Sequence, residues 1–264
     1  MPVDRAILAD ARAGMGAPTR TDQRSNNQLR PLSGEPGVLS RADGSARFSH
    51  DKTEVLVAVY APAEVKRARE RLDAATIEVI VRPRAGLPGP VERELEQLLI
   101  STLEPCLITA LHPRTAVSIV VQITHDDGGL LSAALNGTCV ALMHAGVPMR
   151  GMLTGCCIAM MPSGDALLDP TLEEQQAAEA VVTYGIELRQ RADEPHATER
   201  RLLLSRVQGR ISQTNYELCL RAAQDAGACL AAFYRQALRK ATVELPVEFR
   251  LGGESEHMRA RDGE

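Results

Sequence analysis

A short acidic segment rich in glycine is the strongest candidate for chemistry in this sequence. Residues 126–129 read Asp-Asp-Gly-Gly and precede a run of small and apolar residues, 131–145, that predicts a buried helix. A helix start presents unpaired N–H groups and the positive end of its dipole, so a glycine loop there is typical of a phosphate site. Phosphate is strongly hydrated, and proteins usually add a forked arginine to hold it. Leu130 and Leu131 follow the glycines and supply neither charge nor a donor.

Acidic side chains that could bind a divalent cation fall into two clusters. Magnesium at a phosphoryl-transfer site is usually held through one or two carboxylates. Spacing alone is weak evidence for a site, so we interpret both clusters as turn and loop acids exposed to water. A metal-dependent nuclease site in one of them is the alternative, and His112 and His144 are interpreted as structural residues. The clusters are His125, Asp126 and Asp127, and Asp165, Asp169, Glu173 and Glu174.

Composition restricts the classes of function. The chain has 264 residues with 44% hydrophobic and 24% charged residues, which is ordinary for a soluble globular protein. Its formal net charge of −4 lacks the basic excess of an autonomous nucleic-acid-binding domain. There is no Trp, and only 3% of the residues are aromatic, which argues against a platform for base stacking. Any contact with RNA is therefore expected to be local.

The six cysteines include no CxxC pair, and most lie in apolar segments, so we predict buried, reduced thiols in an intracellular protein. Adjacent Cys156 and Cys157 should point to opposite faces of a strand. The first 30 residues contain no apolar signal region, and no apolar run reaches the roughly 18 residues that span a bilayer, so no membrane partner is expected.

The elements that position these residues alternate between strands and helices. Gly137 costs a helix about 1 kcal/mol relative to Ala, which predicts a close approach between its helix and a sheet. We predict one α+β domain over 29–241, built from two similar halves of βαβ type, with a disordered tail at 1–28 and a charged extension at 242–264. The expected strands are 46–49, 53–60, 77–81, 117–123, 151–161, 166–169, 180–188 and 202–207, and the expected helices are 91–103, 131–145 and 213–240.

Two stretches, 126–142 and 167–181, resemble the RNase PH family, in which phosphate attacks the last linkage at an RNA 3′ end. The resemblance implies an RNase PH-like fold, with phosphate held by the loop and the following helix start. The family's Thr-Arg pair falls on Leu130 and Leu131, and its two acidic residues fall on Gln175 and Val181. It therefore implies a degenerate site with no catalytic residue, metal or cofactor. Propensity predicts a helix from 171 through 180, whereas the resemblance implies a short turn and then the strand at 180.

Further segments, including 39–46, 82–89 and 145–150, resemble the smallest RNase PH-like subunit of the eukaryotic exosome core. The resemblance implies a ring of six RNase PH-like subunits, cap subunits with RNA-binding domains, RNA threaded through the channel and a separately bound nuclease. It also implies a location in nucleus, nucleolus and cytoplasm. The cations expected to contact RNA are Lys66, Arg67, Arg69, Arg82 and Arg84.

The leading hypothesis is a non-catalytic ring subunit that supports 3′-to-5′ processing and degradation of RNA, in rRNA maturation and mRNA decay. One alternative is an active exoribonuclease, either phosphorolytic or metal-dependent. A second is a free-standing nucleic-acid-binding protein, for example a homodimer. In that case the neutralisation of several phosphates should give a steep loss of affinity with salt.

Overall fold

Two β-sheets form the framework of the chain in this computed structural model, which describes residues 20, 22–65, 67–190 and 198–244. The first sheet has the strand order β1-β2-β3-β5-β4. Its neighbouring strands are antiparallel except β4 and β5, which are parallel. The strands are β1 (Leu32–Pro36), β2 (Gly44–His50), β3 (Thr53–Glu64), β4 (Thr76–Arg82) and β5 (Thr115–His125).

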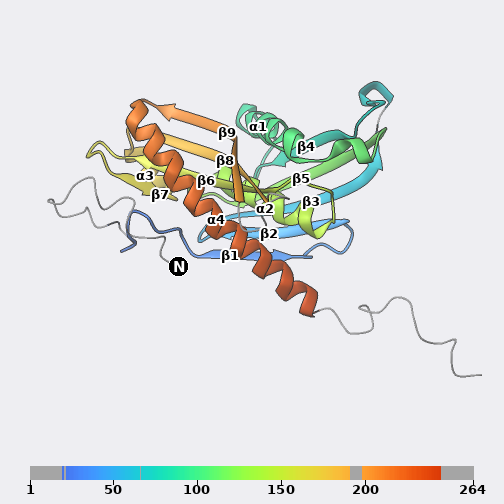
Figure 1. Cartoon of the computed structure of the whole chain (residues 1–264), viewed down its shortest axis with the longest axis horizontal. Coiled ribbons are helices and arrows are strands. Elements are labelled where there is room, and N and C mark those ends of the chain that lie inside the picture. Colours follow the sequence, from blue (N-terminus) through green and yellow to red (C-terminus); the bar gives the residue numbers. More distant parts are fainter. Residues whose placement is uncertain (1–19, 21, 66, 191–197, 245–264) are drawn as a thin grey trace, which may run out of the picture.

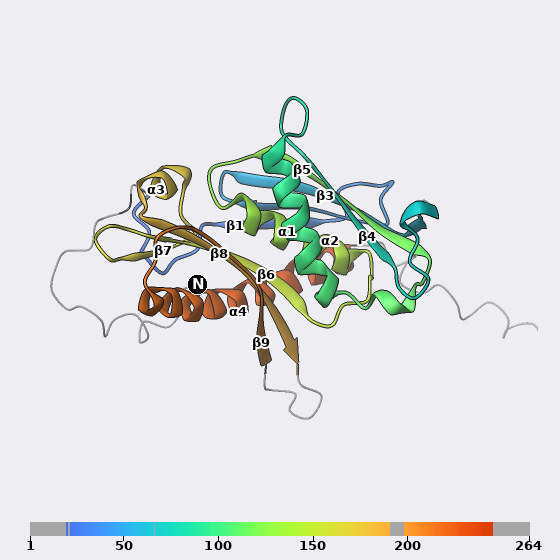
Figure 2. The ribbon, with the colours of Figure 1, turned by 90° about the horizontal axis from the view of Figure 1, so that it is seen from above.

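The second sheet is antiparallel throughout and has the order β7-β6-β8-β9. Figure 2 shows the paired ends of β8 and β9 projecting past the helices. The strands are β6 (Met152–Met160), β7 (Ala166–Leu168), β8 (Ala180–Gln190) and β9 (Thr198–Gly209).

The helices separate and cover the sheets. Helix α2 contacts β2 and β3 of the first sheet and β6 and β8 of the second, so it is shared by both. Helix α4 packs on β6 and β8 and continues to the β1 edge, as its diagonal course in Figure 1 shows. The helices are α1 (Pro90–Cys106), α2 (Leu130–His144), α3 (Leu172–Ala177) and α4 (Gln213–Glu244), with 3₁₀ turns η1 (Arg67–Arg69) and η2 (Thr109–Leu111).

The core follows from the alternation of side chains along the strands. Val55, Val57 and Val59 are fully buried on the face of β3 that α2 covers, and every residue of α2 from Leu131 to Leu142 is buried. This confirms the expectation of a helix that is buried nearly all round. Gly137 allows a close approach between α2 and the first sheet, because an added Cβ would lie 3.0 Å from Val55 Cγ2 and 3.2 Å from Phe48 Cβ.

The expected α+β, RNase PH-like fold class and most of the expected elements are confirmed. Among the described strands, only the first half contains a βαβ unit, β4-α1-β5, because the strands of the second sheet are all antiparallel, so the prediction of two βαβ halves is wrong for the second half. The capping box of Thr171 and Glu174 is present, but α3 ends at Ala177 because β8 begins at Ala180. The helix that propensity predicts through 180 is therefore wrong, and the strand from 180 is correct. Strand β1 was not expected, because its Gly34 and Pro36 disfavour strands except at a sheet edge, and β1 is an edge.

Residues 20 and 22–28, within the predicted tail, are among those that the structure describes. Arg20 is buried, and Leu168 N donates a hydrogen bond to Asn26 O at 2.8 Å. At the other end, α4 continues to Glu244, beyond the predicted limit of 241. Within the predicted tail and extension, residues 1–19, 21 and 245–264 lie outside the described residues.

The cysteines agree with the prediction for thiols. All six are unpaired, and all but the partly exposed Cys229 are buried. Cys156 faces α4, where its Sγ lies 3.6 Å from Ala223 O, whereas Cys157 contacts Thr183, so the adjacent pair does point in opposite directions. Among the described helices, none combines the length and apolar character needed to cross a membrane.

Replacement of Gly137 by Val should destabilise the fold, because the added methyl groups would collide with Val55 and Phe48. Overpacking of this kind costs about 1–3 kcal/mol. Urea unfolding measured by circular dichroism should show a lower midpoint with an unchanged slope. The matched control is Ala228→Val on the exposed side of α4, which should stay within about 0.5 kcal/mol of the parent chain. Equal stability of the two variants would contradict the close packing at Gly137.

Candidate functional site

The glycine loop and the start of α3 form one unit. Gly128 has φ +87° and Gly129 has φ +71°, backbone conformations that favour glycine. An added Cβ on Gly128 would lie only 2.7 Å from Leu172 N, and Leu172 N donates to Asp127 O at 3.0 Å. The two segments that the sequence singled out, 126–142 and 167–181, therefore meet in space.

A buried ion pair fastens this loop to the rest of the domain. Arg30 Nη2 donates to Asp169 Oδ1 at 2.7 Å, and Arg30 N donates to Asp169 Oδ2 at 3.1 Å. The same guanidinium donates to Asp127 O and to Gly128 O, each at 3.0 Å. Thr53 Oγ1 donates to Gly128 O at 2.7 Å. Two loop carbonyls are thereby held toward the protein interior.

His50 and Asn136 complete the network. Asn136 donates from Nδ2 to Gly155 O at 3.0 Å and accepts from Gly155 N at 2.6 Å, which fixes the orientation of its amide. His50 Nε2, 3.0 Å from Asn136 Nδ2, then accepts a hydrogen bond. His50 Nδ1 carries the proton and donates it to Asp169 Oδ2 at 3.1 Å.

These contacts determine the charge of Asp169. Burial alone would raise the pKa of its carboxyl, but the interactions with His50 and Arg30 outweigh burial and hold the pKa well below its usual value of 3.8. Burial likewise favours a lower pKa for Arg30, and the hydrogen bond and charge of Asp169 raise it instead. Asp169 is therefore ionised at neutral pH, and its charge offsets that of Arg30.

Arg20 and Arg24 lie within the predicted N-terminal tail, and both contact the segment around Asp169 and α3. Arg20 pairs with Glu174 at 2.8 Å and donates to Leu168 O at 3.0 Å. Burial tends to raise the pKa of Glu174, but its hydrogen bonds from Arg20 and from Thr171 N lower the pKa overall. Arg24 Nη1 donates to Asp169 O at 3.4 Å. No sequence motif that we recognised marked these arginines, or Arg30 and His50, whereas a polar Asn136 inside an apolar helix was a usable signal.

The four positions that the sequence predicted to be degenerate lie around the second sheet and α2. Gln175 Nε2 donates to Cys157 Sγ at 3.6 Å, and Val181 lies two residues from Thr183, which pairs with Cys157 across β6 and β8. Burial raises the pKa of Cys157 to about 12, so its thiol is neutral at pH 7. Leu131 is 4% exposed within the hydrophobic core, and Leu130 packs against that core.

The acidic clusters have structural roles in this arrangement. Asp126 Oδ1 accepts from Gly128 N at 3.0 Å, and Asp165 accepts from Ser163 Oγ at 2.7 Å in an exposed turn. Asp169 is 1% exposed, so its interpretation as a loop acid exposed to water was wrong, because Arg30 and His50 make its burial favourable. His144 Nδ1 accepts from Ser45 N at 3.4 Å. Within the described ranges, no group of three or more His, Cys, Asp or Glu could hold a metal ion.

The cations predicted to contact RNA fall at two separate ends of β4. Arg67 and Arg69 lie in η1, before β4 begins, and Arg69 pairs with Glu78 at 3.1 Å. Arg82 ends β4, about 20 Å along the strand from its first residue, Thr76, and Arg84 follows it; both arginines are exposed. Because β4 and β5 are parallel, Arg82 and Arg84 lie at the sheet edge where β5 leads into the glycine loop. Lys66 lies outside the described residues.

Strands and helices in this arrangement, with a glycine loop at the start of a shared central helix, define an RNase PH-like protein. Residues 28–148 match the 3′ exoribonuclease family, domain 1. The chain is 34% identical over 229 residues to the "Exosome complex exonuclease RRP46 homolog" of Arabidopsis thaliana, covering 82% of this chain and 94% of that protein. The chain thus belongs to the RNase PH family of 3′ exoribonucleases, and it is similar to proteins named as exosome subunits.

Solved structures agree with this assignment. The crystal structure of rice (Oryza sativa) Rrp46 superposes with a TM-score of 0.77 at 32% identity, covering 83% of this chain and 100% of that one. An Archaeoglobus fulgidus exosome with RNA bound to the active site gives a TM-score of 0.66 at 20% identity, over 81% of this chain and 92% of that one. At that identity the second likeness supports the fold alone.

Replacement of Asp169 by Asn should strongly destabilise the domain, because Arg30 would keep a buried charge without a counter-ion and one of the two oxygens that accept from Arg30 and His50 would become an NH2 donor. Breaking a buried pair from one side costs about 3–5 kcal/mol. Urea unfolding at pH 7 measures the loss, and Asp165→Asn in the exposed turn is the control, expected to stay within about 0.5 kcal/mol.

The same pair gives stability a definite pH dependence. Since the folded pKa of Asp169 lies below its usual value of 3.8, the unfolded chain binds more protons in that range, and the contribution of Asp169 is lost as the pH falls below about 4. Stability of the parent chain should decline from pH 4 to pH 3 more steeply than that of Asp169→Asn. Parallel declines would show that Asp169 does not control this part of the profile.

Proposed function

We propose that the chain is a non-catalytic structural subunit of the RNA exosome ring, corresponding to the smallest RNase PH-like subunit, exosome component five. The observation that carries the proposal is chemical. The loop and the following acid-bearing segment meet as an RNase PH-like site requires, but the four positions that should bind phosphate and metal hold Leu130, Leu131, Gln175 and Val181. None of these side chains is charged, and Leu131 belongs to the core.

The role of such a subunit is to complete a barrel of six RNase PH-like subunits through which RNA is threaded. Cap subunits with RNA-binding domains and an associated nuclease act with the ring, in rRNA maturation and mRNA decay. The protein works in the nucleus and nucleolus and also in the cytoplasm. This proposal is supported by the 34% identity to an exosome protein over most of both chains.

An active exoribonuclease is the second candidate, because the Arabidopsis relative is named an exonuclease. That activity would need phosphate or metal ligands from other side chains, and the exposed Arg82 and Arg84, which lie where β5 leads into the glycine loop, are candidate cations for it. A free-standing nucleic-acid-binding homodimer is a third candidate and rests on the same two arginines.

Catalysis is tested with the purified chain and with the complex purified from its own cells, each given 3′-labelled RNA, inorganic phosphate and magnesium. We expect the chain alone to release no nucleoside diphosphates and the complex to contain other RNase PH-like subunits. Any phosphorolysis by the complex should be unchanged when this chain carries Gln175→Ala. Phosphate-dependent shortening by the chain alone would refute the non-catalytic assignment, and recovery of the chain without RNase PH-like partners would refute the ring assignment.

RNA contact is tested with Arg82→Ala/Arg84→Ala, compared with Arg67→Ala/Arg69→Ala from the other end of β4. Each lost phosphate contact on a single strand lowers the salt slope of binding by about 0.7. We expect the complex with the first double variant to bind single-stranded RNA more weakly, with a slope reduced by about 1.4, and the second to behave like the parent complex. An effect confined to Arg67 and Arg69 would place the RNA path at the opposite end of the sheet.

A further inference from the structure

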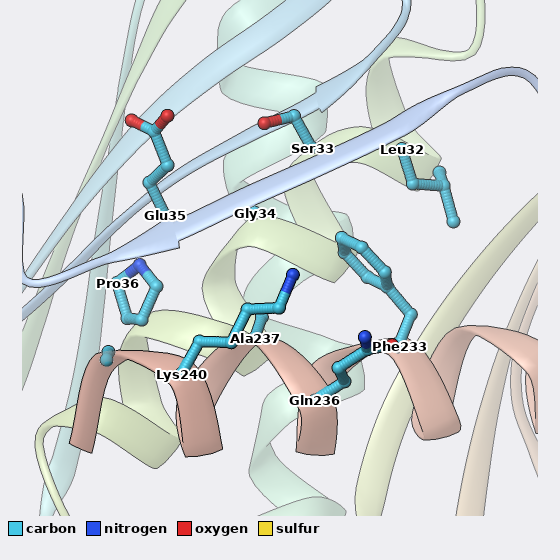
Figure 3. A pocket seen from close by; sticks show the side chains of 10 residues that line it. Leu32, Ser33, Gly34, Glu35, Pro36, Phe233, Gln236, Ala237 and Lys240 are labelled. Atoms are coloured by element: carbon cyan, nitrogen blue, oxygen red, sulfur yellow. The ribbon is translucent and has the colours of Figure 1, made fainter. Parts of the chain in front are cut away.

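A groove of about 480 Å³ lies between strand β1 and the C-terminal half of α4, away from the glycine loop. Figure 3 shows β1 crossing above α4, with Phe233 and Lys240 rising from the helix toward the strand. The groove is independent of the proposed ring function, since none of its residues belongs to the candidate site. It is lined chiefly by Leu32, Gly34, Pro36, Phe233, Ala237 and Lys240.

The backbone of β1 presents unused hydrogen-bonding groups along this groove. Asp51 N donates to Pro31 O at 2.8 Å and Gly37 N donates to Ser45 O at 2.9 Å, so the odd-numbered residues of β1 bond to β2. The N–H and C=O groups of Leu32 and Gly34 therefore point to the other side, where no strand of the described residues neighbours β1. Pro36 offers a carbonyl but no N–H at the end of this edge.

Residues of α4 line the groove on the side of β1 that faces the helix. Ser33 and Glu35 point away from α4 in Figure 3. Gly34 permits close contact with the helix, because an added Cβ would lie 3.0 Å from Phe233 Cε1. The Phe233 ring and Ala237 thus provide an apolar surface beside the open backbone groups of β1.

Lys240 makes one end of the groove positively charged, whereas Phe233 lies further along the helix. Lys240 is exposed and has no carboxylate partner among the described residues, and seven helical residues separate it from Phe233, or about 10 Å. Strand side chains on one face repeat every 6–7 Å or so, and the long, flexible side chain of Lys240 can reach across the remaining distance to a residue at i+2. An apolar residue would rest on Phe233 and a carboxylate would face Lys240.

We propose that this groove binds an extended segment of a partner protein by strand addition to β1. The segment pairs with the N–H and C=O groups of Leu32 and Gly34, and it carries an aliphatic residue and an acidic residue at positions i and i+2. Backbone pairing gives the affinity in this mode of recognition, and the alternate side chains give specificity. Lys240 selects the acid by charge.

A second copy of this chain fits the groove less well when it offers its own β1. The inward-facing residues of β1 are Leu32, Gly34 and Pro36, none of which is acidic, and Pro36 lacks the N–H that pairing needs. The sequence of 245–251 carries its apolar residues at alternate positions and no aliphatic residue two places from an acid. Neither β1 of a second copy nor residues 245–251 therefore offers an aliphatic residue two positions from an acidic residue that could pair with Lys240.

The probe is a capped peptide, Thr-Val-Thr-Asp-Thr, compared with the same peptide carrying Lys in place of Asp. Titration into isotope-labelled protein to about 5 mM, followed by amide NMR, should shift the Leu32 and Gly34 resonances, and the Asp peptide should bind about two- to fivefold more tightly. In Lys240→Glu the preference should reverse. Arg239→Glu, an exposed neighbour outside the groove lining, should keep the parent preference.

Three results would overturn the proposal. These are the absence of shifts at Leu32 and Gly34 with either peptide, shifts centred elsewhere on the protein, and a preference that Lys240→Glu leaves unchanged. A change of the Leu32 and Gly34 resonances with protein concentration alone, without peptide, would assign the edge to a second copy instead. A change of the Leu32 and Gly34 resonances on removal of 245–264, together with tighter binding of the peptide, would assign it to the chain's own C-terminus.

Discussion

The buried pairing of Arg30 with Asp169 is the interaction on which the rest of the site depends. It joins the segment before β1, the end of β7 and the glycine loop, three regions that are far apart in the sequence. Two ions are expensive to remove from water, and the cost is offset only when the pair is close and its remaining hydrogen-bonding groups are satisfied. Asp169 meets this condition with partners on both oxygens, whereas Arg30 Nε has none.

The framework of the glycine loop depends on backbone position and shape, whereas the side chains at the four positions predicted to be degenerate are uncharged. The glycines, the shared helix and the contact between Gly128 and α3 are features of position and shape, and they do not require charge. A site that binds phosphate and magnesium does require charged or polar side chains, because phosphate needs hydrogen-bond donors or cations and magnesium needs carboxylates. Apolar substitution at Leu131 places that residue in the core, where it adds buried apolar surface.

Local patterns in the sequence were sufficient for much of the fold but not for the centre of the site. The apolar alternation of β3, the uninterrupted apolar run of α2 and the glycine at 137 each have a local cause, and each was predicted. The partners of Asp169 come from 139 and 119 residues away, and no spacing rule predicts such contacts. The short edge strand β1 was missed because its residues have weak strand propensity and its pairing with β2 decides its conformation.

Helix α2 belongs to both halves of the molecule, since it packs on the first sheet at Gly137 and on the second at Gly155, where an added Cβ would lie 2.8 Å from Ser132 O. Neither sheet can keep a covered inner face if this helix leaves, so the halves have no separate cores. Unfolding is therefore expected to be a single cooperative event that exposes both sheets together, and a stable fragment containing only one sheet is not an available intermediate.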